Sequence, residues 1–428
     1  MLQTILSPQL DQLAEDFLEH YRFSFSELSE EVYQAFHHRI RSVLTASIQV
    51  DREALVAHSK RLSALNFEHH IPFIVLINEL NVIKNRLTQQ LIEHNAKEAV
   101  FQLQGIYADV ENILAHEHLV HYMDRLEASN TARINSLKDL MKQNLVHYYK
   151  GHLEWLTTLT QAIRAFDVGA VPELNASRCL FGGWLYEQGA EVISNRSKYQ
   201  YLLGVHQTLH SLAKAIQTQM NKPQPNFNIM ASYLEKCELI SLSIGTELAL
   251  IDNRLMVKES SKDNMTGALS RNTLDAIFNH QYELSLATDA TFVLVMCDLD
   301  HFKKLNDAHG HLAGDAVLKE FVSIVRNTLR ESDIVIRYGG EEFVILMPNS
   351  RIEQAYQKLE NVRLNMNTLC CSHEDQWIAT SVSMGVVEIV PRPIDDPKQL
   401  VSYFIKQADK LLYQAKSAGR NRVEIESH

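Results

Sequence analysis

Acidic residues and paired glycines in the last third of the chain are suited to binding a divalent metal ion. Asp298-Leu-Asp300 directly follows an apolar run, Phe292 to Cys297, which predicts a buried strand. Gly339-Gly-Glu-Glu-Phe343 lies between two further apolar runs and predicts a hairpin turn. Acidic side chains at adjacent strand ends can converge, and proteins bind Mg²⁺ through one or two carboxylates plus substrate phosphates. The spacing alone leaves open a second interpretation, in which these carboxylates are solvated turn residues.

Two further pairs of polar residues are suited to binding a nucleotide. Asn306 and Asp315 carry amide and carboxylate groups that can hydrogen-bond to the edge of a guanine base. Lys416 and Arg420 stand four residues apart. At this i, i+4 spacing both side chains could neutralise phosphate charge. Together the two pairs favour a local site for one nucleotide.

Three histidines and one cysteine in the middle of the chain form a second set of candidate ligands. His152, Cys179, His206 and His210 are separated by 27, 27 and 4 residues. The last two lie one helical turn apart, which lets two imidazoles bind one metal ion. Three imidazoles and a thiolate complete a tetrahedral zinc set. The alternative is a pair of surface histidines and a buried cysteine that acts as a small apolar residue.

The composition predicts that long helices make up most of the chain. Its 428 residues include only 15 glycines and 9 prolines, too few for a β-sandwich, a barrel or a linker-rich protein. The formal net charge of −11 argues against a protein that binds duplex DNA, which would need a basic face. The five cysteines are scattered, and we find neither a basic leader nor an apolar run long enough for a membrane span. We therefore expect a reducing, cytoplasmic location.

The hydrophobic pattern divides the chain into four parts. Residues 1–135 show apolar residues at helical spacing and are predicted to form an all-helical domain. Residues 140–222 form a second helical unit, which contains the candidate zinc ligands, and residues 228–260 form a stalk. Residues 261–428 alternate helices and strands around a central hairpin, which favours a ferredoxin-like α+β sheet.

The predicted stalk carries a heptad seam. Seven of its eight seam positions are apolar, with only Ser241 departing: Met230, Leu234, Cys237, Ile244, Leu248, Ile251 and Leu255. About four heptads of this pattern predict a coiled coil roughly 40 Å long. A seam that faces a second copy would make the protein a parallel dimer. The alternative is an amphipathic helix that packs on its own domain.

The motifs of the C-terminal part resemble, block by block and in order, those of the GGDEF family of diguanylate cyclases. Two departures are visible: Met265 stands where the family usually has leucine, and the turn reads Gly-Gly-Glu-Glu-Phe rather than Gly-Gly-Asp-Glu-Phe. The resemblance implies an enzyme that makes cyclic di-GMP from two GTP molecules held by an antiparallel homodimer. The matching blocks are Asp263-Asn-Met-Thr-Gly267, Asp298-Leu-Asp-His-Phe-Lys303, Gly310-His-Leu-Ala-Gly-Asp315, Arg337-Tyr-Gly-Gly-Glu-Glu-Phe343 and Ser381-Val-Ser-Met-Gly385.

This resemblance implies a role for each matching residue. Asp298, Glu341 and the backbone carbonyl of Leu299 would bind Mg²⁺ or Mn²⁺, and Glu342 would help position or activate the ribose 3′-hydroxyl. The implied GTP contacts are guanine with Asn306 and Asp315, and phosphate with the backbone amides of Phe302 and Lys303 and the side chains of Lys416 and Arg420.

A further block stands at the offset of the family's inhibitory product site. In Arg330-Glu-Ser-Asp333, Arg330 would stack on a guanine of cyclic di-GMP and Asp333 would pair with its edge. The alternative is an ordinary salt bridge at the start of a strand. The resemblance favours product inhibition.

The middle of the chain resembles CZB, the chemoreceptor zinc-binding domain, in His152-Leu-Glu-Trp155, Cys179-Leu-Phe-Gly-Gly-Trp184 and His206-Gln-Thr-Leu-His210. This resemblance implies a four-helix bundle in which three histidines and one cysteine bind Zn²⁺. A closed four-ligand site is usually structural rather than catalytic. Because the stalk leads directly from this unit to the cyclase part, we expect zinc to regulate the cyclase. Oxidant sensing by Cys179 is a second hypothesis.

The N-terminal part gives weaker indications. The segment that enters through His69-His70-Ile-Pro72 resembles the helical arrangement of globin-coupled sensors, but Asn66 stands where a proximal haem ligand is expected. We therefore expect a helical, globin-like sensor without haem. His116-Glu-His118-x-x-His121 is either a metal site or, as we favour, a solvated helix face.

Two competing functions remain open at this level. The C-terminal part can be a non-catalytic receptor for GTP or cyclic di-GMP that is joined to a zinc sensor, or the whole chain can buffer zinc or act as a scaffold. The intact Asp298, Glu341 and Glu342 favour the enzyme.

Overall fold

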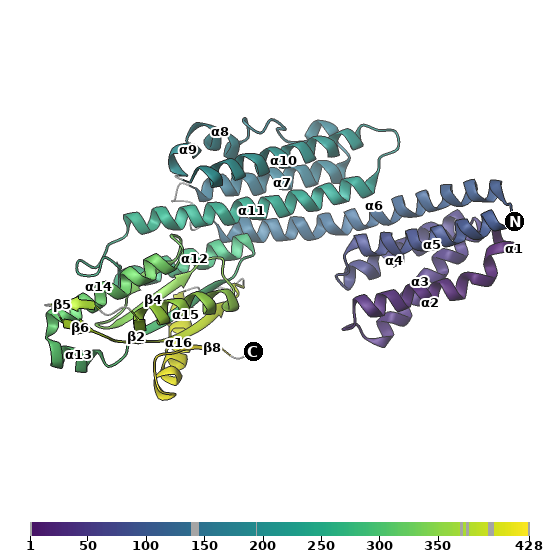
Figure 1. Ribbon diagram of the computed structural model, residues 1–428. Coiled ribbons are helices and arrows are strands. Elements are labelled where there is room, and N and C mark those ends of the chain that lie inside the picture. The colour runs from purple at the N-terminus through teal and green to yellow at the C-terminus, as the bar shows by residue number, and fades with distance from the viewer. Residues whose placement is uncertain are drawn as a thin grey trace. The chain divides into compact units, whose positions relative to one another are not determined.

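The computed structural model shows a helix-rich chain with one mixed β-sheet (Figure 1). It describes residues 2–137, 145–193, 195–368, 371–373, 376–392 and 398–426, so the predicted start of the second helical unit, residues 140–144, lies outside the described residues. Within these ranges no helix combines the length and the apolar character needed to cross a bilayer. The chain divides into two compact units, and both draw on α7, α10 and α11. The first comprises Met1–Ala128, Leu156–Leu174 and Thr208–Glu238, and the second comprises Ser129–Trp155, Asn175–Gln207 and Leu239–His428.

Helices form the N-terminal part, as the sequence predicts. Each turns one apolar face to a shared core of leucine, isoleucine and aromatic side chains. The side chain of Asp51 caps the start of α4 by accepting a hydrogen bond from the amide of Ala54 at 3.0 Å, and Pro72 precedes α5, where a missing amide costs no helical bond. The elements are α1 (Leu2–Leu6), η1 (Ser7–Gln9), α2 (Leu10–Ser24), α3 (Glu30–Gln49), α4 (Arg52–Glu68), α5 (Phe73–Glu93) and α6 (Lys97–Ser136).

The helices that follow carry the candidate zinc ligands and the heptad seam. They are α7 (Val146–Ala165), η3 (Val168–Ala170), α8 (Leu180–Glu187), α9 (Gly189–Val192), α10 (Arg196–Met220) and α11 (Phe227–Glu259). The seam of α11 is buried within the single chain. Ile244, Leu248 and Ile251 belong to one apolar cluster with Leu153 of α7 and Leu284 of α12. These positions therefore pack on the chain itself, as the alternative of an amphipathic helix expects.

The sheet has six strands in the order β1-β3-β4-β2-β7-β8. β1 is parallel to β3 and β7 to β8, whereas the pairs β3–β4, β4–β2 and β2–β7 are antiparallel. The strands are β1 (Leu269–Ser270), β2 (Phe292–Leu299), β3 (Ile334–Arg337), β4 (Glu342–Met347), β7 (Val382–Ile389) and β8 (Val423–Ile425); β5 (Cys371–His373) and β6 (Gln376–Ile378) form a separate pair. The elements of the main sheet from β2 to β7 follow one another as β-α-β-β-α-β, if α13 and α14 count as one helical connection and the separate β5–β6 pair between α15 and β7 is set aside.

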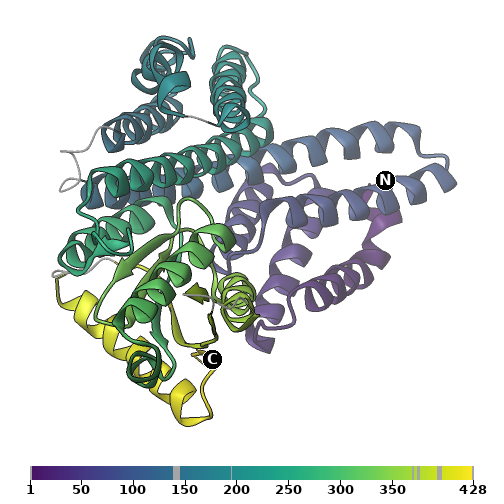
Figure 2. The same ribbon diagram turned by 60° about the vertical axis from the view of Figure 1, so that its left-hand side comes forward.

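Helices cover both faces of this sheet (Figures 1 and 2). Alternate residues of β2 point to opposite faces, so Val293 and Val295 join one apolar cluster while Leu294 and Met296 join another. This explains why the strand reads as a continuous apolar run. The covering helices are α14 (His311–Thr328) and α15 (Ile352–Thr368) on the first face, and α12 (Leu274–Thr288) and α16 (Lys398–Ser417) on the second; η4 (Arg271–Thr273) and α13 (Phe302–His309) precede α12 and α14.

Candidate active site and metal centre

Two adjacent strands bring the predicted magnesium ligands together at one end of the sheet. Asp298, near the end of β2, lies opposite Glu342, the first residue of β4. The amide of Leu299 donates a hydrogen bond to the carbonyl oxygen of Glu341 at 3.3 Å. The backbone of Leu299 and the turn residue Glu341 are therefore neighbours, and both acidic side chains of the turn stand next to Asp298.

The electrostatics of this group favour a bound cation. Asp298 is only 5% exposed, and burial raises its pKa, although the ammonium of Lys416 stands 2.8 Å from Oδ2 and acts in the opposite direction. Burial also raises the pKa of Glu341, and repulsion from Asp298 and Glu342 adds to this effect. Carboxylates that crowd one another in a partly buried place are stabilised by a divalent ion, so this oxygen donor set fits Mg²⁺.

The Gly-Gly turn is held by a residue pair to which the sequence assigned no role. Arg337, at the end of β3, contacts Asp263 at 3.2 Å and donates to the carbonyl oxygen of Gly340 at 2.9 Å. A Cβ atom on Gly339 would lie 2.4 Å from Oε2 of Glu342, so a side chain at this position would displace that carboxylate. The arginine thus fixes the turn, and the glycine makes room for the Glu342 carboxylate. Both partners lie in blocks shared with the family, which is the signal that would have identified them.

The predicted base and phosphate contacts lie on α13 and α14. α13 begins at Phe302, directly after His301 in the left-handed conformation (φ 58°), so the amides of Phe302 and Lys303 are at a free helix N-terminus, which is suited to an anion. Asn306 of α13 lies against α14, where a Cβ atom on Gly314 would meet its Oδ1 at 1.9 Å. Asp315 directly follows this contact. The structure therefore brings the two predicted guanine ligands to neighbouring helices.

Lys416 and Arg420 lie in different backbone conformations. α16 ends at Ser417, and Arg420 lies in the turn that follows, with φ 65°. Gly419 before it has φ 113°, a value that ends a helix sharply. The two cations therefore do not share one helical face, and the turn positions Arg420 independently of Lys416.

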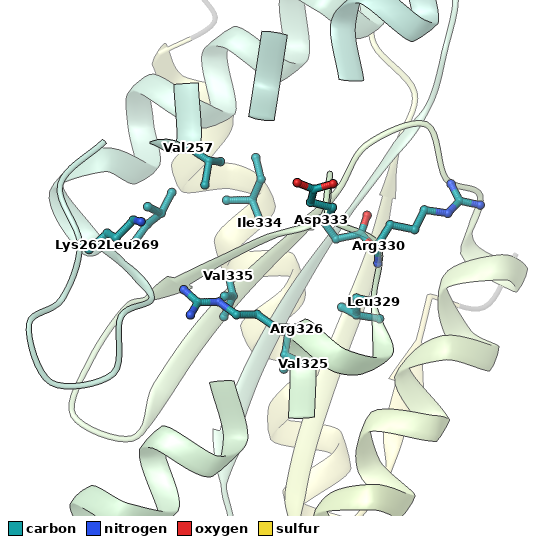
Figure 3. Close-up of a pocket in the computed structure, with 11 residues that line it drawn as sticks. Val257, Lys262, Leu269, Val325, Arg326, Leu329, Arg330, Asp333, Ile334 and Val335 are labelled. Atoms are coloured by element: carbon teal, nitrogen blue, oxygen red, sulfur yellow. The ribbon is translucent and has the colours of Figure 1, made fainter. Parts of the chain in front are cut away.

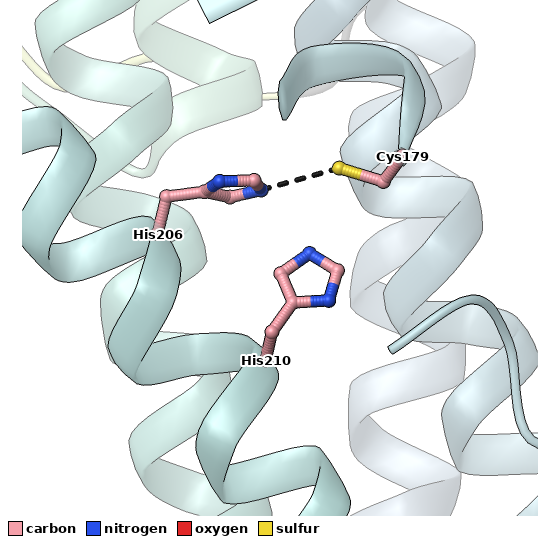
Figure 4. Close-up of side chains that lie close together, drawn as sticks. All are labelled: Cys179, His206 and His210. Atoms are coloured by element: carbon pink, nitrogen blue, oxygen red, sulfur yellow. Dashed lines mark hydrogen bonds between the residues drawn. The ribbon is translucent and has the colours of Figure 1, made fainter. Parts of the chain in front are cut away.

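The candidate zinc ligands gather between α8 and α10 (Figure 4). The sulfur of Cys179 lies 3.2 Å from Nε2 of His206, and the ligand atoms of these two residues and His210 all lie within 4.8 Å of one another. Four ligands around one zinc ion at the usual bond lengths stand roughly 3.3–3.8 Å apart, so small adjustments bring this group to bonding geometry. Burial lowers the pKa of His210, which favours the neutral imidazole that binds metal. The residues therefore fit zinc.

His152, the fourth predicted ligand, lies near this group, but it is not among the residues whose ligand atoms all lie within 4.8 Å of one another. It is 2% exposed, and its ring centroid lies 5.8 Å from that of His206. Its Nδ1 is 3.2 Å from the hydroxyl of Ser241 on α11. A metal-binding histidine typically binds the ion through one ring nitrogen and forms a hydrogen bond through the other. The contact of Nδ1 with Ser241 therefore assigns Nε2 to the metal ion.

Comparison with known proteins agrees with this geometry. Residues 260–422 match the model of the diguanylate cyclase GGDEF domain, and residues 152–217 match that of the chemoreceptor zinc-binding domain, CZB. The chain therefore contains a GGDEF domain and a CZB domain. It is 27% identical over 291 residues to the diguanylate cyclase DgcZ of Escherichia coli, spanning 66% of this chain and 93% of DgcZ. It is 24% identical over 426 residues to the diguanylate cyclase DosC of the same organism, spanning 97% of this chain and 89% of DosC.

Among solved structures, the GGDEF domain of DgcB from Caulobacter crescentus in complex with c-di-GMP is 29% identical, with a TM-score of 0.35. The match covers 39% of this chain and 93% of that one.

The GGDEF domain also contains a pocket beside the Arg-x-x-Asp block (Figure 3). Its volume is about 340 Å³, and apolar side chains line it together with five charged residues: Lys262, Arg326, Arg330, Glu331 and Asp333. The two residues of the block do not form the ordinary salt bridge considered above. Instead, the amide of Arg330 donates to Oδ2 of Asp333 at 2.8 Å, while its exposed guanidinium extends away from the backbone.

The structure explains the two N-terminal features left open by the sequence. Asn66 is 1% exposed, accepts a hydrogen bond from the hydroxyl of Tyr21 at 3.0 Å and donates to the carbonyl of Ile71 at 2.9 Å, so its amide has a structural role. The expected solvated histidine face is wrong for His118. This residue is 6% exposed, lies 2.7 Å from Glu235 and stacks on Phe73. Among the described residues, no metal-binding group forms there.

Proposed function

We propose that this protein condenses two GTP molecules into cyclic di-GMP and two pyrophosphates. The observation that carries the proposal is the convergence of Asp298, Glu341 and Lys416, two carboxylates and a cation, at one sheet end. Mg²⁺, when bound there, supplies charge neutralisation for the triphosphate. Asp298, Glu341 and the carbonyl of Leu299 would hold it.

In this proposal the remaining residues orient the reactants. Glu342 accepts a hydrogen bond from the ribose 3′-hydroxyl, whose oxygen attacks the α-phosphorus of the second GTP while pyrophosphate leaves. Asn306 and Asp315 bind guanine, and the amides at the start of α13 with Lys416 and Arg420 bind phosphate. Because each domain holds one GTP, catalysis needs a second copy whose site faces the first.

Incubation of the full chain with GTP and Mg²⁺ tests the activity. We expect one cyclic di-GMP and two pyrophosphates to form for every two GTP molecules consumed. Tight binding of GTP without product would favour the competing function, a nucleotide receptor.

We further propose that zinc at the CZB ligands changes the cyclase rate, and Tyr149 supports this. Tyr149 stands three residues before His152 on α7 and is 2% exposed. Its hydroxyl donates to the carbonyl of Ala287 on α12 at 3.2 Å, and its ring packs so closely on α11 that a Cβ atom on Gly245 would lie 2.3 Å away. α12 leads into β2, the strand that carries Asp298. One residue therefore joins the helix of a zinc ligand to the cyclase domain.

Replacing Tyr149 by Phe is expected to weaken the zinc effect while zinc still binds. Loss of a buried hydrogen bond of about 1 kcal/mol reduces the ratio of rates with and without zinc by about fivefold. Rates are measured on zinc-loaded and chelated protein alongside Tyr148→Phe, which removes a neighbouring hydroxyl from a ring stacked on Trp184. An unchanged ratio in Tyr149→Phe, or an equal loss in both variants, would contradict this route.

Product inhibition at the Arg-x-x-Asp block is the third part of the proposal. In the described part of the chain, Oδ1 of Asp333 has no hydrogen-bond partner, and burial raises the pKa of this carboxyl. A carboxylate oxygen in that state suits the N–H donors of a guanine edge, and the exposed Arg330 can stack on the base.

Arg330→Ala is expected to raise the cyclic di-GMP concentration that halves the rate by about tenfold or more, because charge-assisted hydrogen bonds contribute about 1.5–3 kcal/mol. The initial rate without product should stay as in the parent chain. Inhibition curves with Arg351→Ala, another exposed arginine of the GGDEF domain, provide the control. Equal inhibition of the Arg330 variant and the parent would rule out this site.

A further inference from the structure

Asp300, the second carboxylate of the Asp298-Leu-Asp300 motif, has no role in the site described above. It lies just beyond the end of β2 and is 4% exposed. Its amide donates to the carbonyl of Ser381 at 2.8 Å, and its carbonyl accepts a hydrogen bond from the hydroxyl of Thr380 at 3.0 Å. The residue is therefore fixed to the segment that enters β7.

The carboxylate of Asp300 is fully engaged. Oδ2 accepts from the hydroxyl of Ser381 at 2.6 Å and from the backbone amide of Asn421 at 3.0 Å, while Oδ1 accepts from the hydroxyl of Ser383 at 2.7 Å. A buried carboxylate needs such donors to offset the loss of solvent, and hydrogen bonds to a charged acceptor are the stronger kind. These contacts direct both oxygens toward β7 and the C-terminal turn, so Asp300 is not placed as a metal ligand.

The bond to Asn421 matters because of the backbone around it. Gly419, Arg420 and Asn421 have φ angles of 113°, 65° and 47°, so three successive residues have positive φ values. Each non-glycine residue held in this region costs on the order of 1 kcal/mol and persists only where its surroundings fix it. Three contacts hold the turn. The amide of Arg420 donates to the carbonyl of Ala415 at 2.9 Å, and the amide of Asn421 donates to Asp300. The guanidinium of Arg363 also donates to the side-chain oxygen of Asn421 at 3.0 Å, but only the contact with Asp300 ties the backbone of the turn to the end of β2.

We propose that Asp300 is a positioning residue that holds the turn of Arg420 in its left-handed conformation and thereby directs the guanidinium to the triphosphate. It touches neither substrate nor metal and acts through Asn421. The inference rests on the proposed function, because it takes Arg420 as a phosphate ligand. The positioning role explains why a second buried carboxylate lies so close to Asp298. The negative charge of Asp300 raises the pKa of Asp298.

A double-mutant cycle on the full chain tests the inference. GTP saturation curves are measured for Asp300→Ala, Arg420→Ala and the double variant. Each single change is expected to raise the KM for GTP by about tenfold, the effect of one lost charge-assisted contact, with a smaller change in kcat. The double variant is expected to have the KM of the poorer single variant, since both changes remove the same contact. A KM increase in the double variant equal to the product of the two single-variant increases would overturn the inference.

Asp300→Asn provides a second test that does not depend on the alanine variant folding. Asparagine keeps an acceptor for the Asn421 amide and offers its NH₂ group to the hydroxyl of Ser383, which can also accept. Its KM, kcat and half-saturating Mg²⁺ concentration should stay within about threefold of the parent. Asp289→Asn, an exposed acid in the left-handed region at the end of α12, is the matched control.

Two outcomes separate failure of the inference from failure of the proposed function. A fall in kcat of a hundredfold or more for Asp300→Asn, with a raised Mg²⁺ requirement, would make Asp300 a metal ligand and overturn its positioning role. Arg420→Ala with an unchanged KM would overturn both the positioning role and the phosphate contact, while cyclic di-GMP synthesis by the parent chain would still support the proposed activity.

Discussion

Replacing Glu341 by Gln is expected to lower the rate of cyclic di-GMP synthesis by about a thousandfold or more. An amide is a weaker ligand for Mg²⁺ than a carboxylate, and a catalytic metal ion contributes several kcal/mol of transition-state stabilisation, of which each 1.36 kcal/mol is tenfold in rate. The rate is measured from pyrophosphate release at saturating GTP and Mg²⁺. Glu353→Gln, an exposed acid in the first turn of α15, should leave the rate unchanged.

The same variant should not lower the thermal stability. Burial and repulsion from Asp298 raise the pKa of Glu341 in the folded protein, so its charged form is disfavoured there. A carboxyl group with a raised pKa destabilises the fold at neutral pH, and this effect disappears as the pH falls through the folded pKa. Removing the charge therefore leaves the melting temperature equal or higher. A lower melting temperature together with an active enzyme would contradict the assignment of Glu341 as a metal ligand.

Replacing Cys179 by Ala is expected to remove the bound zinc. A closed site with four ligands binds about one zinc ion per chain. Its ligands supply a binding free energy of roughly 10–16 kcal/mol, and a large part of it depends on the thiolate. The Cys179 sulfur lies 3.2 Å from the Gly182 amide at the start of α8 as well as from Nε2 of His206, so both a hydrogen-bond donor and a second ligand face it. Zinc per chain is measured by mass spectrometry after dialysis against a chelator.

The chain offers a matched control for this experiment. Cys237 on α11 is fully buried, burial raises the pKa of its thiol to about 12, and it lies outside the group formed by Cys179, His206 and His210. Cys237→Ala should keep its zinc and lose only some stability from the small cavity. If Cys179→Ala retains zinc, or if both variants lose it to the same extent, the predicted ligand set is wrong.

Much of the cyclase domain can be predicted from the sequence because local pattern and tertiary structure agree there. The apolar run from Phe292 predicts β2, and Gly339-Gly340 predicts the turn between β3 and β4, which the pairing of Arg337 with Phe343 confirms. The convergence of Asp298 with the turn follows from these two elements. The finer roles of these residues remain proposals.

Other features depend on contacts that no local pattern encodes. The heptad seam of α11 is real as a pattern, but Ile244 and Leu248 use it for packing within the chain. The i, i+4 spacing of Lys416 and Arg420 is helical in number only, because Gly419 ends the helix first. His118 was expected on a solvated face because its partner Glu235 is 117 residues away in the sequence.

The position of β2 in the sheet restricts how the cyclase can be controlled. β2 pairs with β4 on one side and β7 on the other, and all eight of its residues are buried. Its amide protons should therefore exchange with solvent only when the whole domain unfolds. A strand that opens so rarely cannot melt and reform within a catalytic cycle, so a signal cannot act by disordering the Asp298 end of the sheet. In the proposed mechanism, control therefore acts on when, and how often, two intact half-sites meet.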